Sequence, residues 1–155
     1  MALVRVLVDG YSLLHSCPDI APGRAPHSAA ARDALVQLLT RYQDASGTPV
    51  TVIFDGAAAR GARPATPSTR EVEILYSRAD QTADQMIERA AHRLAAYGEV
   101  LVVTDDHAER ETAGAAGAHT SSCPGFIQTV QNAISDLRRD VTSHNRRERH
   151  KFRYD

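Results

Sequence analysis

The chain is poor in several residue types on which particular kinds of chemistry depend. Among its 155 residues there is no tryptophan, only 5% are aromatic, and Lys151 is the single lysine. Mechanisms that need a lysine in the core of a fold are therefore excluded, because Lys151 stands near the C-terminal end. Few aromatic rings also means few platforms on which nucleic-acid bases could stack, so we expect only modest discrimination between base sequences.

Long apolar runs are also absent. No stretch of about 18 consecutive apolar residues could cross a membrane, and no basic segment followed by an apolar one resembles a signal peptide. Cys17 and Cys123 stand far apart and form no CxxC pair, which fits a reducing compartment. We therefore expect a cytoplasmic protein without a membrane segment, and the length is typical of a single domain.

Several enzyme classes lack their signature motifs here. The P-loop pattern GxxxxGK[ST] is absent, and Gly10 stands alone where a dinucleotide-binding fold would carry GxGxxG. No HExxH motif or zinc-type spacing of histidine and cysteine occurs. A haloacid-dehalogenase-type phosphatase needs a second aspartate where Tyr11 stands, and both that class and receiver domains need a lysine that the sheet region does not have.

What the chain does contain is a carboxylate after each of four strand-like runs. The runs are residues 4–8, 50–54, 72–76 and 100–103, and the acids that follow them are Asp9, Asp55, Asp80 with Asp84, and Asp105 with Asp106. In an open parallel α/β sheet, ligands bind outside the carboxyl ends of the strands. Like charges gathered there repel one another unless a cation lies between them.

Helical patterns alternate with these runs. We expect helices from Ser28 to Gly47, from Thr82 to about Tyr97, over residues 109–114 and from Pro124 to about Leu137, with a loop after the first run and an edge strand over residues 118–121. Alternating strands and helices imply a parallel sheet with right-handed crossovers. The expected fold class is α/β, a three-layer α/β/α sandwich with a mainly parallel sheet of four to five strands.

Two segments fall outside this alternation. Residues 57–70 combine glycine, prolines and three arginines, and we interpret them as a long, mobile surface loop. From residue 138 to the end, seven Lys or Arg stand against three Asp or Glu. Because apolar periodicity is missing from about Thr142, we expect residues 1–140 to form the domain and residues 141–155 a basic tail. This tail is either a polyanion contact or a solvated terminus.

The acids at the predicted strand ends form a candidate metal site. Asp9, Asp84 and the Asp105–Asp106 pair supply oxygen ligands from three separated segments, which suits Mg²⁺ or Mn²⁺ rather than Zn²⁺. Each acid alone has an ordinary explanation, as a turn residue, a helix first-turn residue or a helix cap. Together they favour phosphodiester hydrolysis, because such a metal activates bound water and neutralises charge on the phosphate.

Four motifs carry a resemblance to a known family. They are VDGYS at residues 8–12, FDG at 54–56, TADQMIE at 82–88 and VTDD at 103–106. In order and spacing they resemble the YacP-like NYN domains, which are PIN-like ribonucleases, over nearly the whole chain to about Leu137. The resemblance implies a metal-dependent endoribonuclease that cleaves single-stranded RNA with Mg²⁺ or Mn²⁺. Some members act on messenger RNA in association with the ribosome.

The resemblance also implies roles for individual residues. Asp9, Asp84 and Asp106 match the family's metal-binding acids, and Asp105 adds a further acid to the catalytic set. Groups expected around them are Ser12, Asp55, Asp80 and Thr104, where Ser12 replaces the family's usual asparagine. Apart from the resemblance, arginines are expected to contact the RNA backbone, because phosphate contacts give affinity independent of base sequence; they are Arg24, Arg60, Arg63, Arg70, Arg146 and Arg147.

A second interpretation, from another functional class, stays open. The chain could be a catalytically silent PIN-like module that binds RNA or a partner protein and keeps its acids for the fold or for a structural ion. Metal-dependent cleavage of RNA, tested on Asp9→Asn and Asp84→Asn, separates the two interpretations.

Overall fold

Five parallel strands form the centre of the structure. The computed structural model describes residues 3–56 and 72–154. The strands are β1 (Leu3–Asp9), β2 (Val50–Phe54), β3 (Val72–Tyr76), β4 (Glu99–Val103) and β5 (His119–Ser121). Their spatial order is β3-β2-β1-β4-β5, and every neighbouring pair is parallel. The predicted parallel sheet is therefore confirmed, with β5 as its edge strand.

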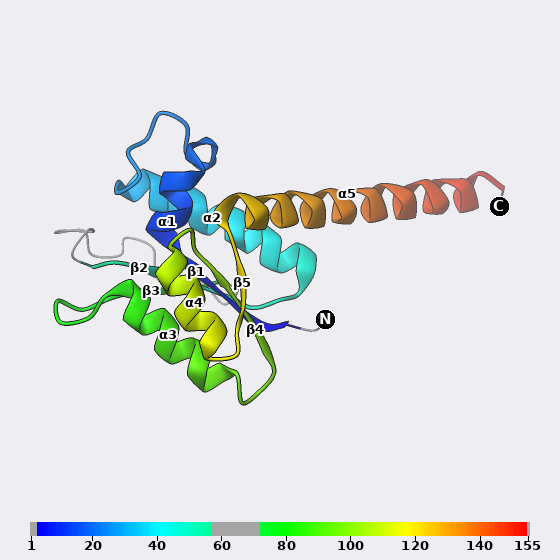
Figure 1. Ribbon diagram of the computed structural model, residues 1–155. Helices are drawn as coiled ribbons and strands as arrows, with labels where there is room; N and C mark the ends of the chain where they lie inside the picture. Colours follow the sequence, from blue (N-terminus) through cyan, green and yellow to red (C-terminus); the bar gives the residue numbers. More distant parts are fainter. Residues whose placement is uncertain (1–2, 57–71, 155) are drawn as a thin grey trace.

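Helices cover both faces of this sheet (Figure 1). They are α1 (Gly10–Ser16), the 3₁₀ helix η1 (Pro18–Ile20), α2 (Ala29–Ser46), α3 (Ala83–Leu94), α4 (His107–Ala115) and α5 (Cys123–Tyr154). Helices α1, α2 and α5 share one hydrophobic core cluster with the sheet, and α3 and α4 share a second one. The three-layer α/β/α sandwich that the sequence predicts is confirmed.

Alternation along β1 divides its side chains between the two clusters. Val6 and Val8 belong to the cluster under α1, α2 and α5, whereas Leu7 belongs to the one under α3 and α4. This two-residue period is what a strand buried on both faces requires. β1 is central in the sheet, so its carboxyl end is held by packing from both sides.

Helix ends follow the expected local signals. The hydroxyl of Ser28 accepts a hydrogen bond from the Ala31 amide at 3.1 Å, and Gly47 ends α2 in the left-handed conformation with φ 74°. Thr82 and Gln85 form a capping box that starts α3. The start of α3 matters for the site, because Asp84 lies in its first turn.

The segment after β1 differs from the prediction. We expected a loop, but α1 begins directly at Gly10 and continues to Ser16. Gly10 is needed there for packing, since a Cβ atom at this position would lie 2.3 Å from the ring of Phe54. The prediction missed α1 because seven residues are too few to show a clear helical period.

The C-terminal segment also differs from the prediction. The last helix does not end near Leu137 but continues as α5 to Tyr154, and it projects beyond the sheet and its covering helices (Figure 1). The segment expected as a basic tail is therefore helical as far as Tyr154, while the expected loop over residues 57–70 lies outside the described residues. Among the described helices, none is both long and apolar enough to cross a membrane.

Candidate metal centre

The order in which the chain adds strands to the sheet reverses between β1 and β4. Strands β2 and β3 lie on one side of β1, and β4 and β5 lie on the other. Val8 pairs with Val103, so Asp9 and Thr104 are the next residues on two adjacent strands. Such a switch point is where open α/β sheets bind their ligands, because the loops there diverge and leave a crevice.

Three carboxylates converge at this switch point. Asp9 ends β1, Asp84 lies in the first turn of α3, and Glu109 lies in the first turn of α4. One oxygen of each lies within 4.8 Å of the others. Three elements that are distant in sequence therefore bring their negative charges to one point.

Glu109 is the most buried member of this carboxylate cluster, with 6% of its surface exposed. Its Oε2 accepts a hydrogen bond from the Thr104 hydroxyl at 2.8 Å, whereas its Oε1 is buried and has no hydrogen-bond partner among the described residues. Burial, the charge of Asp9 and the contact with Asp84 together raise the pKa of Glu109 to about 9. Without a cation, this carboxyl group therefore keeps its proton at neutral pH.

Asp9 combines two roles, as a member of the carboxylate cluster and as the N-cap of α1. Its Oδ1 accepts the Ser12 amide at 3.3 Å. Burial raises the pKa of Asp9, as do the charges of Asp84 and Asp106, although the hydrogen bond from Ser12 opposes the shift. The cap therefore helps to fix the direction of the carboxylate.

Asp106, a predicted metal ligand, is engaged by the backbone of α4. Its Oδ1 accepts the amides of Ala108 at 2.9 Å and Glu109 at 3.3 Å, so it caps this helix. Its charge nevertheless contributes to the raised pKa of Asp9 and so acts on the cluster. By capping α4 it also fixes the turn that carries Glu109.

Asp105 points to α5 and α1. Its Oδ1 accepts the Cys123 amide at 2.8 Å, and its Oδ2 accepts the hydroxyl of Ser16. Burial alone would raise the pKa of Asp105, but these hydrogen bonds lower it. The two adjacent acids at the end of β4 thus each serve a different helix N-terminus. A cap on the helix after the pair was predicted and is confirmed, whereas the contact of Asp105 with the start of α5 was not foreseen.

Ser12 connects these parts through its amide and its hydroxyl. Its amide donates to Asp9, and its hydroxyl accepts the Asp105 amide at 3.0 Å. The same hydroxyl lies 3.7 Å from the Cys123 sulfur. A shorter side chain than the family's usual asparagine therefore joins β1, the loop after β4 and the start of α5.

The other predicted site residues lie elsewhere. Asp55 follows β2, where the Ser77 hydroxyl donates to it at 3.5 Å, and Asp80 is exposed in the turn before α3. Arg24 is exposed in the loop before α2, and Arg146 and Arg147 are exposed on α5. The remaining predicted arginines, Arg60, Arg63 and Arg70, lie outside the described residues.

Glu109 is the cluster member that the sequence analysis missed. It stands in the run Glu109-Arg110-Glu111, which is typical of an exposed helical face. A signal was present, because Thr104, Asp106 and Glu109 have the spacing of a strand end, a helix cap and the third position of that helix. Such a position can turn back toward the end of the strand.

The donor set fits a hard divalent cation. Three carboxylates supply only oxygen atoms, and the ionised form of Glu109, whose Oε1 is buried, needs a positive partner to offset its lost hydration. Mg²⁺ or Mn²⁺ matches these ligands better than Zn²⁺, which prefers nitrogen and sulfur. The cluster can therefore hold a metal ion, although its members differ from the predicted set in Glu109.

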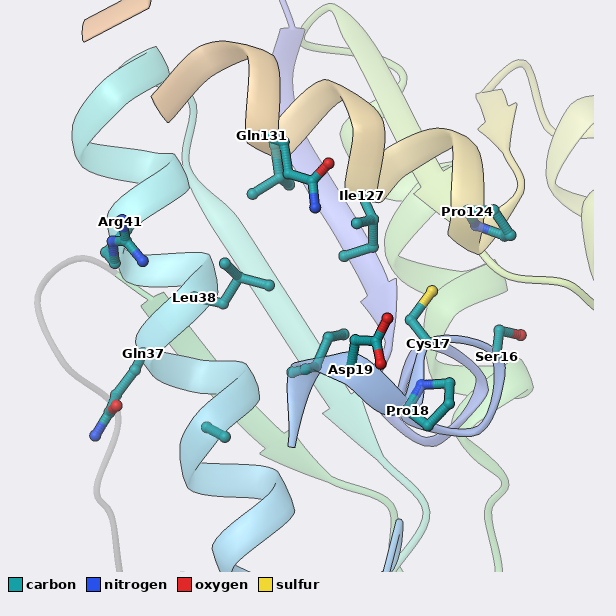
Figure 2. A pocket seen from close by; sticks show the side chains of 13 residues that line it. Ser16, Cys17, Pro18, Asp19, Gln37, Leu38, Arg41, Pro124, Ile127 and Gln131 are labelled. Carbon is teal, nitrogen blue, oxygen red and sulfur yellow. The ribbon is translucent and has the colours of Figure 1, made fainter. Parts of the chain in front are cut away.

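A cavity of about 560 Å³ lies between the α1–η1 segment, α2 and α5 (Figure 2). None of the three clustered carboxylates lines it. Cys17 does, but burial together with the charges of Asp105 and Asp19 raises the pKa of its thiol, so it is not activated as a nucleophile. The cavity therefore adds no reactive group to the site.

A three-layer sandwich with an acidic cluster at the switch point of its parallel sheet is the arrangement expected of the PIN-like nuclease class. The sequence model of the YacP-like NYN domain family matches residues 6–154. The chain belongs to this family, as its four motifs predict, and PIN-like nucleases generally use divalent metals.

Relatives from Bacillus subtilis are similar to the chain in both sequence and structure. It is 30% identical over 142 residues to "Uncharacterized protein YacP" of Bacillus subtilis (strain 168), covering 89% of this chain and 83% of that protein. The crystal structure of Rae1 (YacP) from Bacillus subtilis is 26% identical with a TM-score of 0.78, covering 97% of this chain and 86% of that one. A crystal structure of its tryptophan-to-leucine mutant gives a TM-score of 0.76 at 26% identity, covering 92% and 84%.

Proposed function

We propose that this protein is a metal-dependent endoribonuclease that hydrolyses phosphodiester bonds of single-stranded RNA. The observation that carries the proposal is the convergence of Asp9, Asp84 and Glu109 within 4.8 Å at the switch point of the sheet. Membership of a PIN-like nuclease family supports the reaction class. The basic composition of the C-terminal segment supports a nucleic-acid substrate.

The three clustered carboxylates would hold Mg²⁺ or Mn²⁺, with the charge of Asp106 beside them. The bound ion would supply an activated water and would neutralise charge that develops on the phosphate. Thr104 keeps the buried carboxylate of Glu109 oriented through its 2.8 Å hydrogen bond, and the Ser12 amide does the same for Asp9. Asp105 fixes the loop between β4 and α4 by accepting a hydrogen bond from the Cys123 amide at the start of α5.

Substrate binding is assigned mainly to arginines. Arg24 and the exposed Arg146 and Arg147 would contact RNA phosphates, which gives affinity independent of base sequence. Arg60, Arg63 and Arg70, which lie outside the described residues, are assigned the same role. We assign messenger RNA as the substrate class and the ribosome as the partner that α5 would contact, because ribosomal RNA is a dense polyanion.

Cleavage of RNA tests the carboxylate cluster directly. A labelled single-stranded RNA incubated with Mn²⁺ or Mg²⁺ should be cut internally by the wild-type protein and not in the presence of a chelator. Asp9→Asn, Asp84→Asn and Glu109→Gln should each lower the rate by at least about 100-fold, because each removes a charged ligand that stabilises the transition state. Cleavage is measured by gel electrophoresis of end-labelled fragments.

Glu88→Gln is the matched control, since Glu88 is an exposed acid on the same helix as Asp84. It should cleave as fast as wild type. Equal cleavage by wild type and Asp9→Asn after independent purifications would refute the assignment of the site. Metal binding by the wild type without any cleavage, on free RNA and on ribosomes carrying messenger RNA, would favour the catalytically silent module.

A further inference from the structure

Two exposed histidines from different segments meet outside the carboxylate cluster. His15 lies in the last turn of α1, and His27 directly precedes Ser28, the N-cap of α2. Their Nε2 atoms are 2.9 Å apart, and their rings meet edge-on with centroids separated by 4.8 Å. The two nitrogen atoms form a hydrogen bond in which one imidazole donates its proton to the other, and a metal ion held by both nitrogens would take the place of this proton.

Buried neighbours hold His27 in this orientation. The ring of Tyr11 lies against it with a centroid distance of 4.4 Å, and Tyr11 is itself 6% exposed. Arg32, which is 5% exposed, donates hydrogen bonds to the Tyr11 hydroxyl at 3.2 Å and to the His27 carbonyl at 2.7 Å. Because this support is built into the core, binding a ligand between the rings costs little additional ordering.

A neutral imidazole offers one lone-pair nitrogen, which is a good ligand for borderline transition metals. With metal–nitrogen bonds of about 2.0–2.1 Å, two nitrogens 2.9 Å apart subtend an angle of about 90° at a shared ion. This angle is that of neighbouring positions in the tetragonal and octahedral geometries of Cu²⁺ and Ni²⁺, whereas tetrahedral Zn²⁺ needs roughly 3.3 Å between the nitrogens.

We propose that His15 and His27 form a second metal site that takes a divalent transition metal, Ni²⁺ or Cu²⁺ before Zn²⁺. It differs in chemistry from the carboxylate cluster, because two imidazole nitrogens bind Mg²⁺ poorly. The ion connects α1 to the residue before α2, with water completing its coordination. It therefore restrains α1, the helix that is capped by Asp9 at its other end.

The test uses untagged full-length protein and Ni²⁺, which does not oxidise thiols. Isothermal titration with Mg²⁺ in excess, to keep the carboxylate cluster occupied, should show one Ni²⁺ per chain. His15→Ala and His27→Ala should each weaken this affinity at least 10-fold and remove the rise in melting temperature that Ni²⁺ produces. Circular dichroism confirms that each variant is folded.

His92→Ala is the matched control, because His92 is an exposed histidine on α3. It should bind Ni²⁺ as wild type does, and Cys17→Ser should also be unaffected. The proposal is overturned if the wild type binds no Ni²⁺, if the two histidine variants keep full affinity, or if His92→Ala loses as much as they do. Because this site is independent of RNA cleavage, its failure would leave the proposed nuclease function untouched.

Discussion

The hydroxyl of Thr104 holds Glu109, one of the three clustered carboxylates, through a hydrogen bond. The residue is fully buried, with 0% of its surface exposed, and donates to Glu109 while it accepts the Asp106 amide at 3.2 Å. One oxygen atom therefore orients a clustered carboxylate and also fixes the turn into α4. Removing it leaves both oxygens of Glu109 without a hydroxyl or amide donor among the described residues.

Thr104→Val tests this role with little change in shape. The loss of a hydrogen bond to a buried acceptor should destabilise the fold by about 1–3 kcal/mol. It should also weaken Mn²⁺ binding, because the Thr104 hydrogen bond opposes the rise in the pKa of Glu109 and its loss lets the proton compete better with the metal. Titration calorimetry measures the affinity, and chemical denaturation measures the stability.

The control is Thr112→Val on α4, whose exposed hydroxyl donates to the Ala108 carbonyl at 2.9 Å. It should leave Mn²⁺ affinity unchanged. If Thr104→Val binds Mn²⁺ as tightly as wild type, the hydroxyl does not tune the site.

Individual site residues were predictable from the sequence where a strand end or a helix cap next to them fixes their position. Asp9 follows an apolar run directly, and Asp84 follows a helix cap, so both could be placed at the carboxyl edge of the sheet. The spacing of Glu109 from the Asp106 cap was only a weak signal, because the burial of Glu109 results from the packing of α4 against α3 and the sheet. Asp105 and Asp106 could be placed at the edge, but which helix each one caps depends on side-chain directions that local sequence does not determine.

At the scale of elements, α5 is the part that deviates most from expectation. Its first turns pack on the core through Phe126 and Val130, whereas Leu137 and Val141 are 41% and 52% exposed. Helical apolar spacing runs from Val130 through Ile134 to Leu137 and Val141 and then stops, which is why the helix was predicted to end near Leu137. The segment after Val141 nevertheless has no glycine or proline, so nothing in it breaks the helix.

Deleting the chain from Asn145 tests what the end of α5 contributes. Asn145, Arg146 and Arg147 are exposed, so the melting temperature should stay close to that of wild type, while the helical circular dichroism signal falls. RNA binding should weaken, and the dependence of log K on log salt should become shallower by about 0.7 for each RNA phosphate that the shortened protein no longer neutralises. Fluorescence anisotropy at several salt concentrations measures the slope.

A double variant, Arg146→Gln with Arg147→Gln, separates charge from length. It keeps the helix and should reproduce part of the change in slope. An unchanged slope in both proteins would show that this segment does not contact a polyanion.

At the scale of the whole molecule, the carboxylate cluster links stability to pH and to metal. In the metal-free protein the pKa of Glu109 is raised to about 9, and burial raises that of Asp9 as well. Between about pH 5 and pH 9 the folded chain therefore retains a proton that the unfolded chain releases. The stabilisation from this proton is complete at the lower end of the range and is lost as pH rises through the folded-state pKa.

The metal-free protein should accordingly show a melting temperature that falls as pH is raised from about 5 to 9. Glu109→Gln has no proton to lose at this position, so its melting temperature should change much less over the same range, whereas Glu88→Gln should keep the wild-type slope.

Mn²⁺ favours the ionised cluster, so its stabilising effect should be larger at pH 8 than at pH 6. Below about pH 4 the lowered pKa of Asp105 acts in the opposite direction, which is why the comparison stays above this limit. Differential scanning fluorimetry across this pH range, with chelator or with Mn²⁺, measures all three slopes. Equal slopes for wild type and Glu109→Gln would contradict a proton held by Glu109 in the folded, metal-free protein.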